Sequence, residues 1–408
     1  RGRAKRGYDM DGMTCGVSHV DKLDQFHPCK ILLRSPPSLR RIRVLSNPMS
    51  KVTASQNQNQ KQEQEHYVFE YPQDTSLLPT LGVTCWLGIN GLLVYIISFL
   101  LFPFSYTPSL TSLLPFDPTT LKTSILITAL TLSLLPLPKD ASQHKLGYKF
   151  GDMLMRCAAS YFSLKITCEN PQSLSTIAQT STSGVIFAME PHDILPFPLF
   201  AFNDGLSCIP HVKNAYGLMT SAIFNIPLLR HIYTYTRGHP VDKKTFQSHL
   251  KSNHNVVFVP GGVNEVFEIN PDKPDEIILY LNKRKGFVKL ALEQGTPIVP
   301  CFAFGLSGTY DFVLPKFIYK HKFVIKLSKL LGFLPIYFSG RWGVPFGIPH
   351  PNQINLVIGT PISTLAEKGK VDQETIDKVH SKFLAELTAL FQRHKKSTGN
   401  EHKTIVII

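Results

Sequence analysis

The sequence lacks the short motifs by which several enzyme classes are identified. It has no G-x-S-x-G nucleophile elbow, no G-x-x-x-x-G-K-[ST] phosphate loop, no G-x-G-x-x-G turn and no H-E-x-x-H helix. These absences argue against serine hydrolases, P-loop enzymes, dinucleotide enzymes and zinc proteases. The seven cysteines are scattered and form no C-x-x-C pair, so neither a disulfide framework nor a zinc knuckle is expected.

Acidic side chains are scarce relative to basic ones, and the shortage is greatest near the start. The chain has 29 Asp and Glu against 43 Lys and Arg, a formal net charge of +14, and residues 1–51 carry half of that excess. A run rich in Gln and Asn at 56–64 follows, which cannot build a core. We expect residues 1–75 to form a basic, largely disordered arm that is either solvated or rests on anionic lipid headgroups. Nucleic acid is not expected as a partner, because the basic segment has only two aromatic residues and no binding motif.

Charge is absent altogether from residues 82–102, a run of 21 mostly apolar residues. As a helix this run would extend about 31 Å, roughly the thickness of a hydrocarbon core. A second, weaker run at 121–137 contains Lys122 and Pro136. We therefore expect 82–137 to be a membrane hairpin whose second leg either spans or re-enters, with basic flanks, and so both termini, in the cytosol. Two buried core helices are the alternative.

Downstream of residue 145 the pattern changes to alternating strands and helices. Apolar runs of strand length lie at 185–189, 256–259, 297–304 and 354–358. Helical patterns lie between and after them, at 286–294, closed by Gly295, and at 373–393, with apolar residues on one face. Apolar strands separated by helices are typical of a mostly parallel sheet covered on both faces. We expect an α/β catalytic domain over 145–395, preceded by the hydrophobic hairpin and followed by a C-terminal tail over 396–408.

Polar or glycine-rich turns follow three of these strands, where open α/β sheets bind their ligands. They are EPHD at 190–193, PGGVNE at 260–265 and GLSG at 305–308. His192 is the best candidate for a general base, because imidazole titrates near neutral pH and takes a proton from a hydroxyl without a metal. Glu190 is expected to orient its ring, and Asp193 to cap the segment that follows. A purely structural histidine is the alternative.

The PGGVNE turn offers a second part of the same site. Gly261 and Gly262 allow a tight turn whose backbone N–H groups face an oxyanion or a phosphate. Glu265 is then placed to support His192 or its protonated ring. The alternative for this motif is an ordinary strand-to-helix turn whose glutamate favours the helix dipole.

Three consecutive cations precede the helix at 286–294. They are Lys283, Arg284 and Lys285, and they suit a polyanion such as the phosphates of coenzyme A. A solvated charged face is the alternative. His211, in an I-P-H-V segment, and Arg341, in an R-W-G turn, are weaker candidates for the site.

Together these motifs give the chain a resemblance to a known family. EPHD, IPHV, PGGVNE, RKGFVKLALEQGTPIVPCFAFG and GRWGVPFGIPHPNQINLVIGTPI resemble, in order and rough spacing, the type 2 diacylglycerol acyltransferase family, from the apolar hairpin to about residue 390. The resemblance implies that His192 stands in place of the family's proposed catalytic histidine, and Glu265 in place of the glutamate of its glycine turn. EPH is the plant and algal form of the first motif, whereas Asp193 departs from the Gly or Ser found there. Phe197 occupies the position of Asp in the wider His-x4-Asp acyltransferases, so no charge relay from that position is expected.

The resemblance also implies an activity and a location. It points to a multi-pass membrane enzyme of the endoplasmic reticulum that transfers a fatty acyl group from acyl-CoA to diacylglycerol and releases triacylglycerol and CoA. Acyl-CoA is then a co-substrate, and no cofactor is needed. The lipid bilayer is an expected partner. The resemblance leaves open whether the chain forms a homo-oligomer and whether it also occurs at a lipid-droplet surface or a plastid envelope. Acyltransferases that use monoacylglycerol, a wax alcohol or a sterol are the nearest alternatives. A non-catalytic lipid-binding membrane protein is the alternative of another class.

Overall fold

The computed structural model describes residues 42–45, 66–101, 118–137, 144–204, 206, 209–270, 272–313 and 336–408. Most of the predicted basic arm and the segment that joins the two apolar runs lie outside the described residues. Two pieces of the arm are strands, β1 (Ile42–Leu45) and β2 (His66–Glu70), which pair antiparallel with each other. The disorder expected for residues 1–75 is therefore not found in these two segments.

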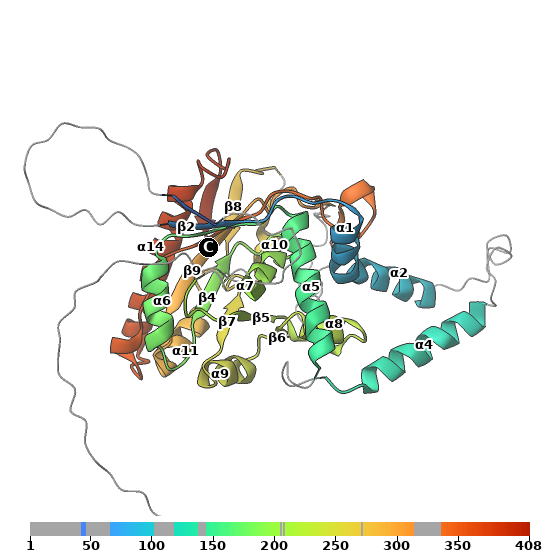
Figure 1. Cartoon of the computed structure of the whole chain (residues 1–408), viewed down its shortest axis with the longest axis horizontal. Coiled ribbons are helices and arrows are strands. Elements are labelled where there is room, and N and C mark those ends of the chain that lie inside the picture. Colours follow the sequence, from blue (N-terminus) through green and yellow to red (C-terminus); the bar gives the residue numbers. More distant parts are fainter. Residues whose placement is uncertain are drawn as a thin grey trace, which may run out of the picture. The chain divides into compact units, whose positions relative to one another are not determined.

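A nine-stranded sheet forms the centre of the described part of the chain (Figure 1). Its strands lie in the order β1, β2, β3 (Lys165–Cys168), β12 (Asn355–Ile358), β9 (Ile298–Phe304), β4 (Ile186–Glu190), β7 (Asn255–Phe258), β5 (Ala215–Met219) and β6 (Gly238–Pro240). The five strands from β9 to β6 are mutually parallel, and β12 and β3 are parallel to each other. The pairings β12–β9, β2–β3 and β1–β2 are antiparallel. The mostly parallel sheet that the sequence predicts is thus confirmed.

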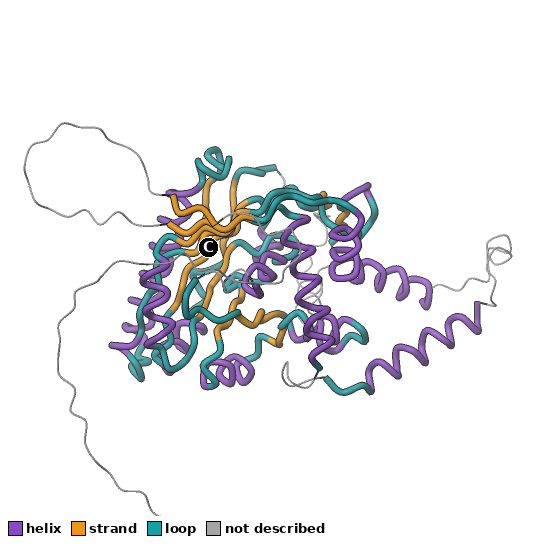
Figure 2. Tube along the Cα trace, viewed as in Figure 1, coloured by secondary structure: helices purple, strands orange, loops and turns teal. Residues whose placement is uncertain are grey.

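Burial on both faces explains why these strands are apolar throughout. Every residue of β4, β7 and β9 is buried, as strands covered on both sides require. One hydrophobic cluster joins one face of the sheet to α5 (Lys145–Tyr161) and to the segment that follows β4. The other cluster joins the opposite face to α9 (Lys243–Lys251), α11 (Gly286–Gln294) and α14 (Gln373–His394). Helices therefore flank the sheet on both sides (Figure 2).

The remaining elements are short. The other helices of the described residues are α1 (Leu77–Val83), η1 (Thr84–Gly88), α2 (Ile89–Leu101), α4 (Pro118–Leu134), α6 (Pro171–Thr180), η3 (Phe197–Phe200), α7 (Ala201–Asp204), η5 (Ser221–Asn225), α8 (Leu229–Tyr235), α10 (Asn264–Glu268), η6 (Arg341–Gly343) and η7 (Leu365–Glu367). Strand β10 (Asp311–Val313) pairs antiparallel with β11 (Tyr337–Ser339). Gly295 ends α11 in the left-handed conformation, as the sequence predicts for a helix stop.

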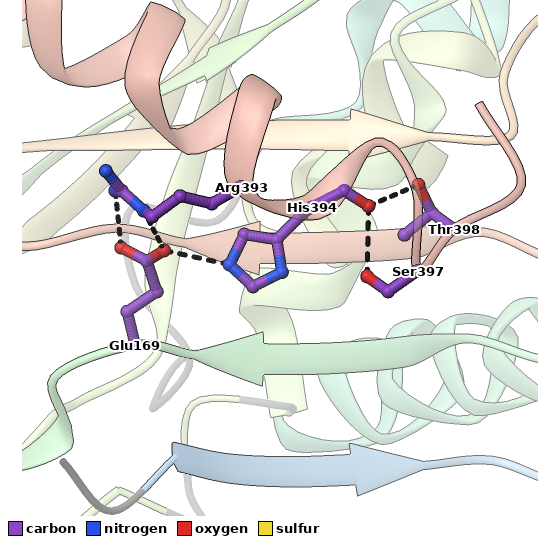
Figure 3. Close-up of polar contacts among 5 residues, drawn as sticks. All are labelled: Glu169, Arg393, His394, Ser397 and Thr398. Carbon is purple, nitrogen blue, oxygen red and sulfur yellow. Dashed lines mark hydrogen bonds and ion pairs between the residues drawn. The ribbon is translucent and has the colours of Figure 1, made fainter. Parts of the chain in front are cut away.

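Helix α14 is the longest helix of the described residues and is anchored at both ends. Asp372 caps its start by accepting the Thr375 backbone N–H at 2.8 Å. Near its other end, Arg393 donates to both carboxylate oxygens of Glu169 at 2.7 and 2.8 Å, and His394 Nε2 lies 2.8 Å from Glu169 Oε1 (Figure 3). Because Glu169 directly follows β3, these contacts fasten the helix to the sheet.

The first apolar run is only partly available to a membrane. Helices α1, η1 and α2 are consecutive, and Leu77–Ser98 is long and apolar enough to cross a membrane, the one such stretch among the described residues. Its first half packs into the domain, where Val83, Trp86 and Leu87 are buried. The first half is therefore a core helix, which is one of the two alternatives that the sequence leaves, while the whole stretch has the length and composition of a candidate span.

The second apolar run does not make a second span. Helix α4 has 17 residues, about 26 Å at the usual rise, which is less than a hydrocarbon core of about 30 Å. Leu126, Leu130 and Leu134 on it are exposed. The multi-pass prediction is thus corrected: the described residues contain one candidate span and one shorter apolar helix.

The predicted C-terminal tail is part of the folded domain. Strand β13 (Thr404–Ile407) pairs parallel with β8 (Glu276–Leu279). The carbonyl of Ile408 accepts the backbone N–H groups of Leu281 and Asn282, both at 3.0 Å. The last residues therefore hold the loop that leads into the cationic segment at 283–285.

Candidate active site

Two buried glutamates join the turns that follow β4 and β7. Glu190, the last residue of β4, accepts the backbone N–H of Gly261 on Oε1 at 2.8 Å. Glu265, on α10, accepts the backbone N–H of His192 at 2.8 Å and that of Tyr280 at 2.9 Å. The side chains are 0% and 2% exposed, respectively. The EPHD and PGGVNE motifs are thus one site at the carboxyl edge of the parallel strands, as their positions predict.

The two carboxyl groups share this buried space and hold a proton. Burial and the neighbouring Glu265 charge raise the pKa of Glu190 well above its usual range, against the Gly261 N–H and Arg284, which lower it. Burial raises the pKa of Glu265 to about 7, although two backbone N–H groups, the Glu190 side chain and Arg284 all oppose the rise. Like charges so close cannot both persist in a dry site. Glu190 therefore keeps its proton at neutral pH, and Glu265 is the partner that loses its proton as pH rises through about 7.

The ring of His192 has a defined tautomer. Its Nδ1 lies 2.8 Å from the backbone carbonyl oxygen of Asp193. A carbonyl only accepts, so Nδ1 carries the hydrogen and Nε2 keeps its lone pair. Burial lowers the pKa of His192 to about 4, although the Asp193 carbonyl works in the other direction. The ring is therefore neutral at physiological pH and presents Nε2 as a base.

The partners of the His192 ring differ from those expected. Glu190 bonds to Gly261 and does not orient the ring, and Glu265 holds the His192 backbone and not its imidazole. The ring is oriented by the main chain of Asp193, which has a positive φ of 48°. The Asp193 side chain accepts the next backbone N–H, that of Ile194, at 2.6 Å, in keeping with the expected capping of the following segment.

One of the two glycine N–H groups in this turn is already used within the described residues. The Gly261 N–H is occupied by Glu190, so this part of the predicted oxyanion site is corrected. Among the described residues, no acceptor is found for the Gly262 N–H. Gly262 has a φ of 61°, a conformation that favours glycine. A Cβ on Gly261 would collide with the Glu265 carboxylate, so glycine is required at both positions for different reasons.

One of the three predicted cations belongs to the site. Arg284 donates through Nη2 to the Gly261 carbonyl at 3.3 Å, and its guanidinium lies 5.1 Å from the Tyr280 ring centroid. Its charge lowers the pKa of both glutamates. Lys285 instead forms an ion pair of 2.7 Å with Asp377 on α14, and Lys283 is exposed, as a solvated face would be.

The two weaker candidates lie elsewhere. His211 comes before β5, and the nearby Lys213 carbonyl accepts from Asn255 at the start of β7. Because β5, β7 and β4 are parallel, His211 is at the opposite edge of the sheet from His192. Arg341 donates to Thr80 on α1 at 3.3 Å and lies over the Trp342 ring, so it links η6 to the apolar helix.

Lys403 is a charged residue near the site that the sequence did not single out. It lies just before β13, is half-buried, and its charge lowers the pKa of Asp193, whose burial raises that pKa more strongly. No local motif marks it, because its proximity depends on the pairing of β13 with β8. Within the described residues, no group of three His, Cys, Asp or Glu side chains is placed to hold a metal ion.

Comparison with known proteins places the chain in a family. The model of a family described as diacylglycerol acyltransferase matches residues 121–408. The chain is 32% identical over 239 residues to diacylglycerol O-acyltransferase 2 of Danio rerio, an alignment covering 54% of this chain and 64% of that protein. It is 32% identical over 231 residues to the protein of the same name from Dictyostelium discoideum, covering 53% and 68%, and 30% identical over 249 residues to that of Homo sapiens, covering 56% and 61%.

The chain thus spans about two thirds of the length of these curated relatives, and no solved structure matches it. The family match over most of its length, together with a histidine, two glutamates and a glycine turn gathered at one sheet edge, shows that the chain belongs to the diacylglycerol acyltransferase family.

Proposed function

We propose that this chain transfers a fatty acyl group from acyl-CoA to the free hydroxyl of diacylglycerol, giving triacylglycerol and CoA. One observation carries the proposal: the Asp193 carbonyl fixes the hydrogen of His192 on Nδ1 and leaves Nε2 as a neutral base. A neutral imidazole nitrogen can accept the proton of an alcohol, which is the first requirement of O-acylation. The names of the relatives, diacylglycerol O-acyltransferase 2, supply the acceptor class.

The reaction follows from this geometry. Nε2 of His192 takes the hydroxyl proton as the acceptor oxygen attacks the thioester carbonyl, and a C–O bond forms. The Gly262 N–H donates a hydrogen bond to the tetrahedral oxyanion. A donor of this kind typically stabilises the charge by about 3 kcal/mol. The C–S bond then breaks, and the imidazolium returns the proton to the thiolate of CoA.

Glu265 supports the charge that appears on His192 during this step. An imidazolium in a buried site is unfavourable unless a negative charge lies close by. Glu265 is fixed by two backbone N–H groups, one of them from His192 itself. The proton held by Glu190 leaves the pair with a single negative charge, which balances the single positive charge of the intermediate.

The substrates approach from different directions in this proposal. Arg284 lies beside the glycine turn and is the candidate contact for the CoA phosphates. The apolar helix Leu77–Ser98 is the candidate route from the bilayer of the endoplasmic reticulum for the lipid acceptor.

The sheet supports a re-entrant arrangement in the membrane. Strand β2 precedes the apolar helices and β3 follows them, yet the two are paired neighbours in one sheet. The chain must therefore enter and leave the membrane on the same face. With one candidate span and the shorter α4, we propose that residues 77–137 dip into the bilayer and return, with the flanking segments on the cytosolic side.

An acceptor panel tests the proposed function. The purified full chain is incubated with labelled oleoyl-CoA and, separately, dioleoylglycerol, monooleoylglycerol, hexadecanol or cholesterol, with the variant His192→Ala as the blank. Triacylglycerol formed only by the wild type supports the proposal. Wax or sterol esters without triacylglycerol would show that the acceptor is a long-chain alcohol or a sterol and not diacylglycerol. The absence of any ester would favour a lipid-binding protein.

A further inference from the structure

A π-helical turn interrupts the apolar helix and carries a buried indole. Element η1 (Thr84–Gly88) has the wider π geometry, which is often found at functional sites. Trp86 in this turn is 5% exposed, and its Nε1–H has no acceptor among the described residues. The indole N–H is only a donor, and a buried donor without an acceptor destabilises the fold. The turn therefore holds a hydrogen-bond donor that no described part of the chain uses.

Two tyrosine hydroxyls add donors to the same region. Tyr310, in the segment after β9, is 4% exposed, and no group in the described part of the chain bonds to its hydroxyl. The Tyr233 hydroxyl on α8 accepts from Asn90 Nδ2 at 3.2 Å, and its own hydrogen meets no acceptor in the described part of the chain. Asn90 lies one helical turn after Trp86. Burial raises the pKa of Tyr310 well above its usual range, and the nearby hydroxyls of Tyr233 and Tyr161 raise it further, so the phenol stays protonated.

These donors belong to the same core as the His192 turn. Trp86, Tyr233 and Tyr310 lie in one hydrophobic cluster with Ile194, two residues after His192. A series of aromatic contacts leads from the indole toward that turn, with ring centroids 5.7 Å apart for Trp86–Phe200, 6.0 Å for Phe200–Phe162 and 4.7 Å for Phe162–Phe197. A series of packed aromatic rings thus extends from the apolar helix to Phe197, in the segment that follows the His192 turn.

We propose that Trp86, Tyr233 and Tyr310 form the acceptor site and bind the ester carbonyls of diacylglycerol. Unused buried donors select a ligand that brings acceptors into an apolar space, and ester carbonyl oxygens do so. A long-chain alcohol or a sterol has no ester carbonyl. The site therefore favours a diacyl glyceride over the other acceptors of the same reaction, and this inference rests on the proposed acyltransferase function.

The test compares two acceptors of the same shape. Dioleoylglycerol is set against its 1,2-dialkyl ether analogue, which keeps the free hydroxyl and both chains but has no carbonyl groups. The wild type is expected to have the lower KM for the ester. In Trp86→Phe and in Tyr310→Phe, the KM for the ester should rise roughly fivefold per lost hydrogen bond toward that for the ether, while the KM for the ether stays unchanged.

A matched control separates binding from structure. The Tyr161 hydroxyl is buried in the same core but donates to the Pro349 carbonyl at 2.7 Å. Tyr161→Phe should lower the Tm and leave the ratio of the KM for the ester to the KM for the ether unchanged. Tyr310→Phe removes a hydroxyl that has no partner among the described residues, so its Tm should stay equal or rise, while the ratio of the KM for the ester to the KM for the ether rises toward one.

Binding measurements decide the proposal even without turnover. In a Trp342→Phe background Trp86 is the remaining tryptophan, because the chain has two, and its fluorescence reports on its surroundings. Dioleoylglycerol should shift this emission at lower concentration than the ether analogue. Equal responses, or an equal KM for ester and ether in the wild type, would overturn the acceptor site and leave the acyl transfer intact. Selective ester binding by a chain that transfers no acyl group would uphold the site and refute the proposed function.

Discussion

Replacing Glu265 by glutamine removes one negative charge with almost no change in shape. Both carboxylate oxygens of Glu265 accept a backbone N–H, from His192 and from Tyr280. Glutamine retains one carbonyl oxygen, and its amide must face the other N–H as a second donor. One of the two bonds is therefore lost, together with the negative charge that we propose supports the imidazolium.

The size of the effect follows from the burial of this carboxylate. A hydrogen bond to a charged group contributes about 1.5–3 kcal/mol, and the side chain is 2% exposed, so solvent screens it little. If that loss falls on the transition state, in which His192 becomes charged, kcat drops by roughly 10- to 100-fold. The KM for acyl-CoA should stay nearly constant, because Glu265 contacts the catalytic turn and not the candidate CoA contact.

Glu190→Gln is the matched control. Glu190 is the protonated partner, so a glutamine reproduces it: the oxygen still accepts from Gly261, and the amide replaces the acid hydrogen. Its kcat should fall less than about threefold, a change of less than 1 kcal/mol. Steady-state kinetics on both variants with oleoyl-CoA and dioleoylglycerol provide the comparison. If Glu190→Gln is as damaging as Glu265→Gln, the assignment of the proton within the pair is wrong.

The pH dependence gives a second readout of the same group. The pKa of Glu265 is about 7, so kcat of the wild type should rise as pH increases through 7, and this step should vanish in Glu265→Gln. His192, with a pKa of about 4, stays neutral there and contributes no step. The free energy of unfolding changes in the opposite direction, because folding raises the pKa of this carboxyl group. The group stabilises the fold fully below its unfolded pKa of about 4.3, and this contribution is lost as pH rises through 7. A kcat that is flat between pH 6 and 8 would refute the role of the carboxylate.

Three further variants test other parts of the structure. His192→Ala should lower kcat by about 10²–10⁴-fold at normal protein level, whereas His211→Ala, at the opposite sheet edge, should retain activity; more than about a tenth of activity in the first would place the base elsewhere. Arg284→Gln should raise the KM for acyl-CoA in a salt-dependent way and leave that for diacylglycerol unchanged, with the exposed Lys289→Gln as control. Glu169→Gln should lower the free energy of unfolding by about 2 kcal/mol, less than for a fully buried pair because the Arg393 side chain is 46% exposed; an unchanged denaturation midpoint would contradict the anchoring role of this cluster.

The sequence by itself determined the local elements and the residue types of the site. Continuous apolar runs predict β4, β7 and β9, because a strand covered on both faces needs apolar side chains throughout. Helical spacing of apolar residues predicts the buried face of α14. Parallel strands bring their carboxyl ends to one edge, so the EPHD and PGGVNE turns could be placed together without coordinates.

The tertiary structure alone decided which atoms meet within that site. Sequence spacing suggested that Glu190 would reach the His192 ring, but β4 and β7 are neighbours, and this pairing brings Glu190 to the Gly261 N–H instead. Tyr280 and Lys403 enter the site through the pairing of β8 with β13, which no local pattern encodes. Lys285 does not belong to the site, because Asp377 on α14 lies close enough to form an ion pair with its ammonium group.

The role of the apolar run was also beyond the sequence. Hydropathy measures how apolar a helix is and not what lies beside it, so it describes a core helix and a membrane helix alike. The fold buries the first half of residues 77–98, where Val83, Trp86 and Leu87 face the core, and leaves Leu92 and Ile97 of the second half exposed. Because β2 and β3 are paired across this segment, its two flanks lie on the same side of any bilayer that the segment enters, since hydrogen-bonded neighbours in a sheet cannot be separated by a bilayer.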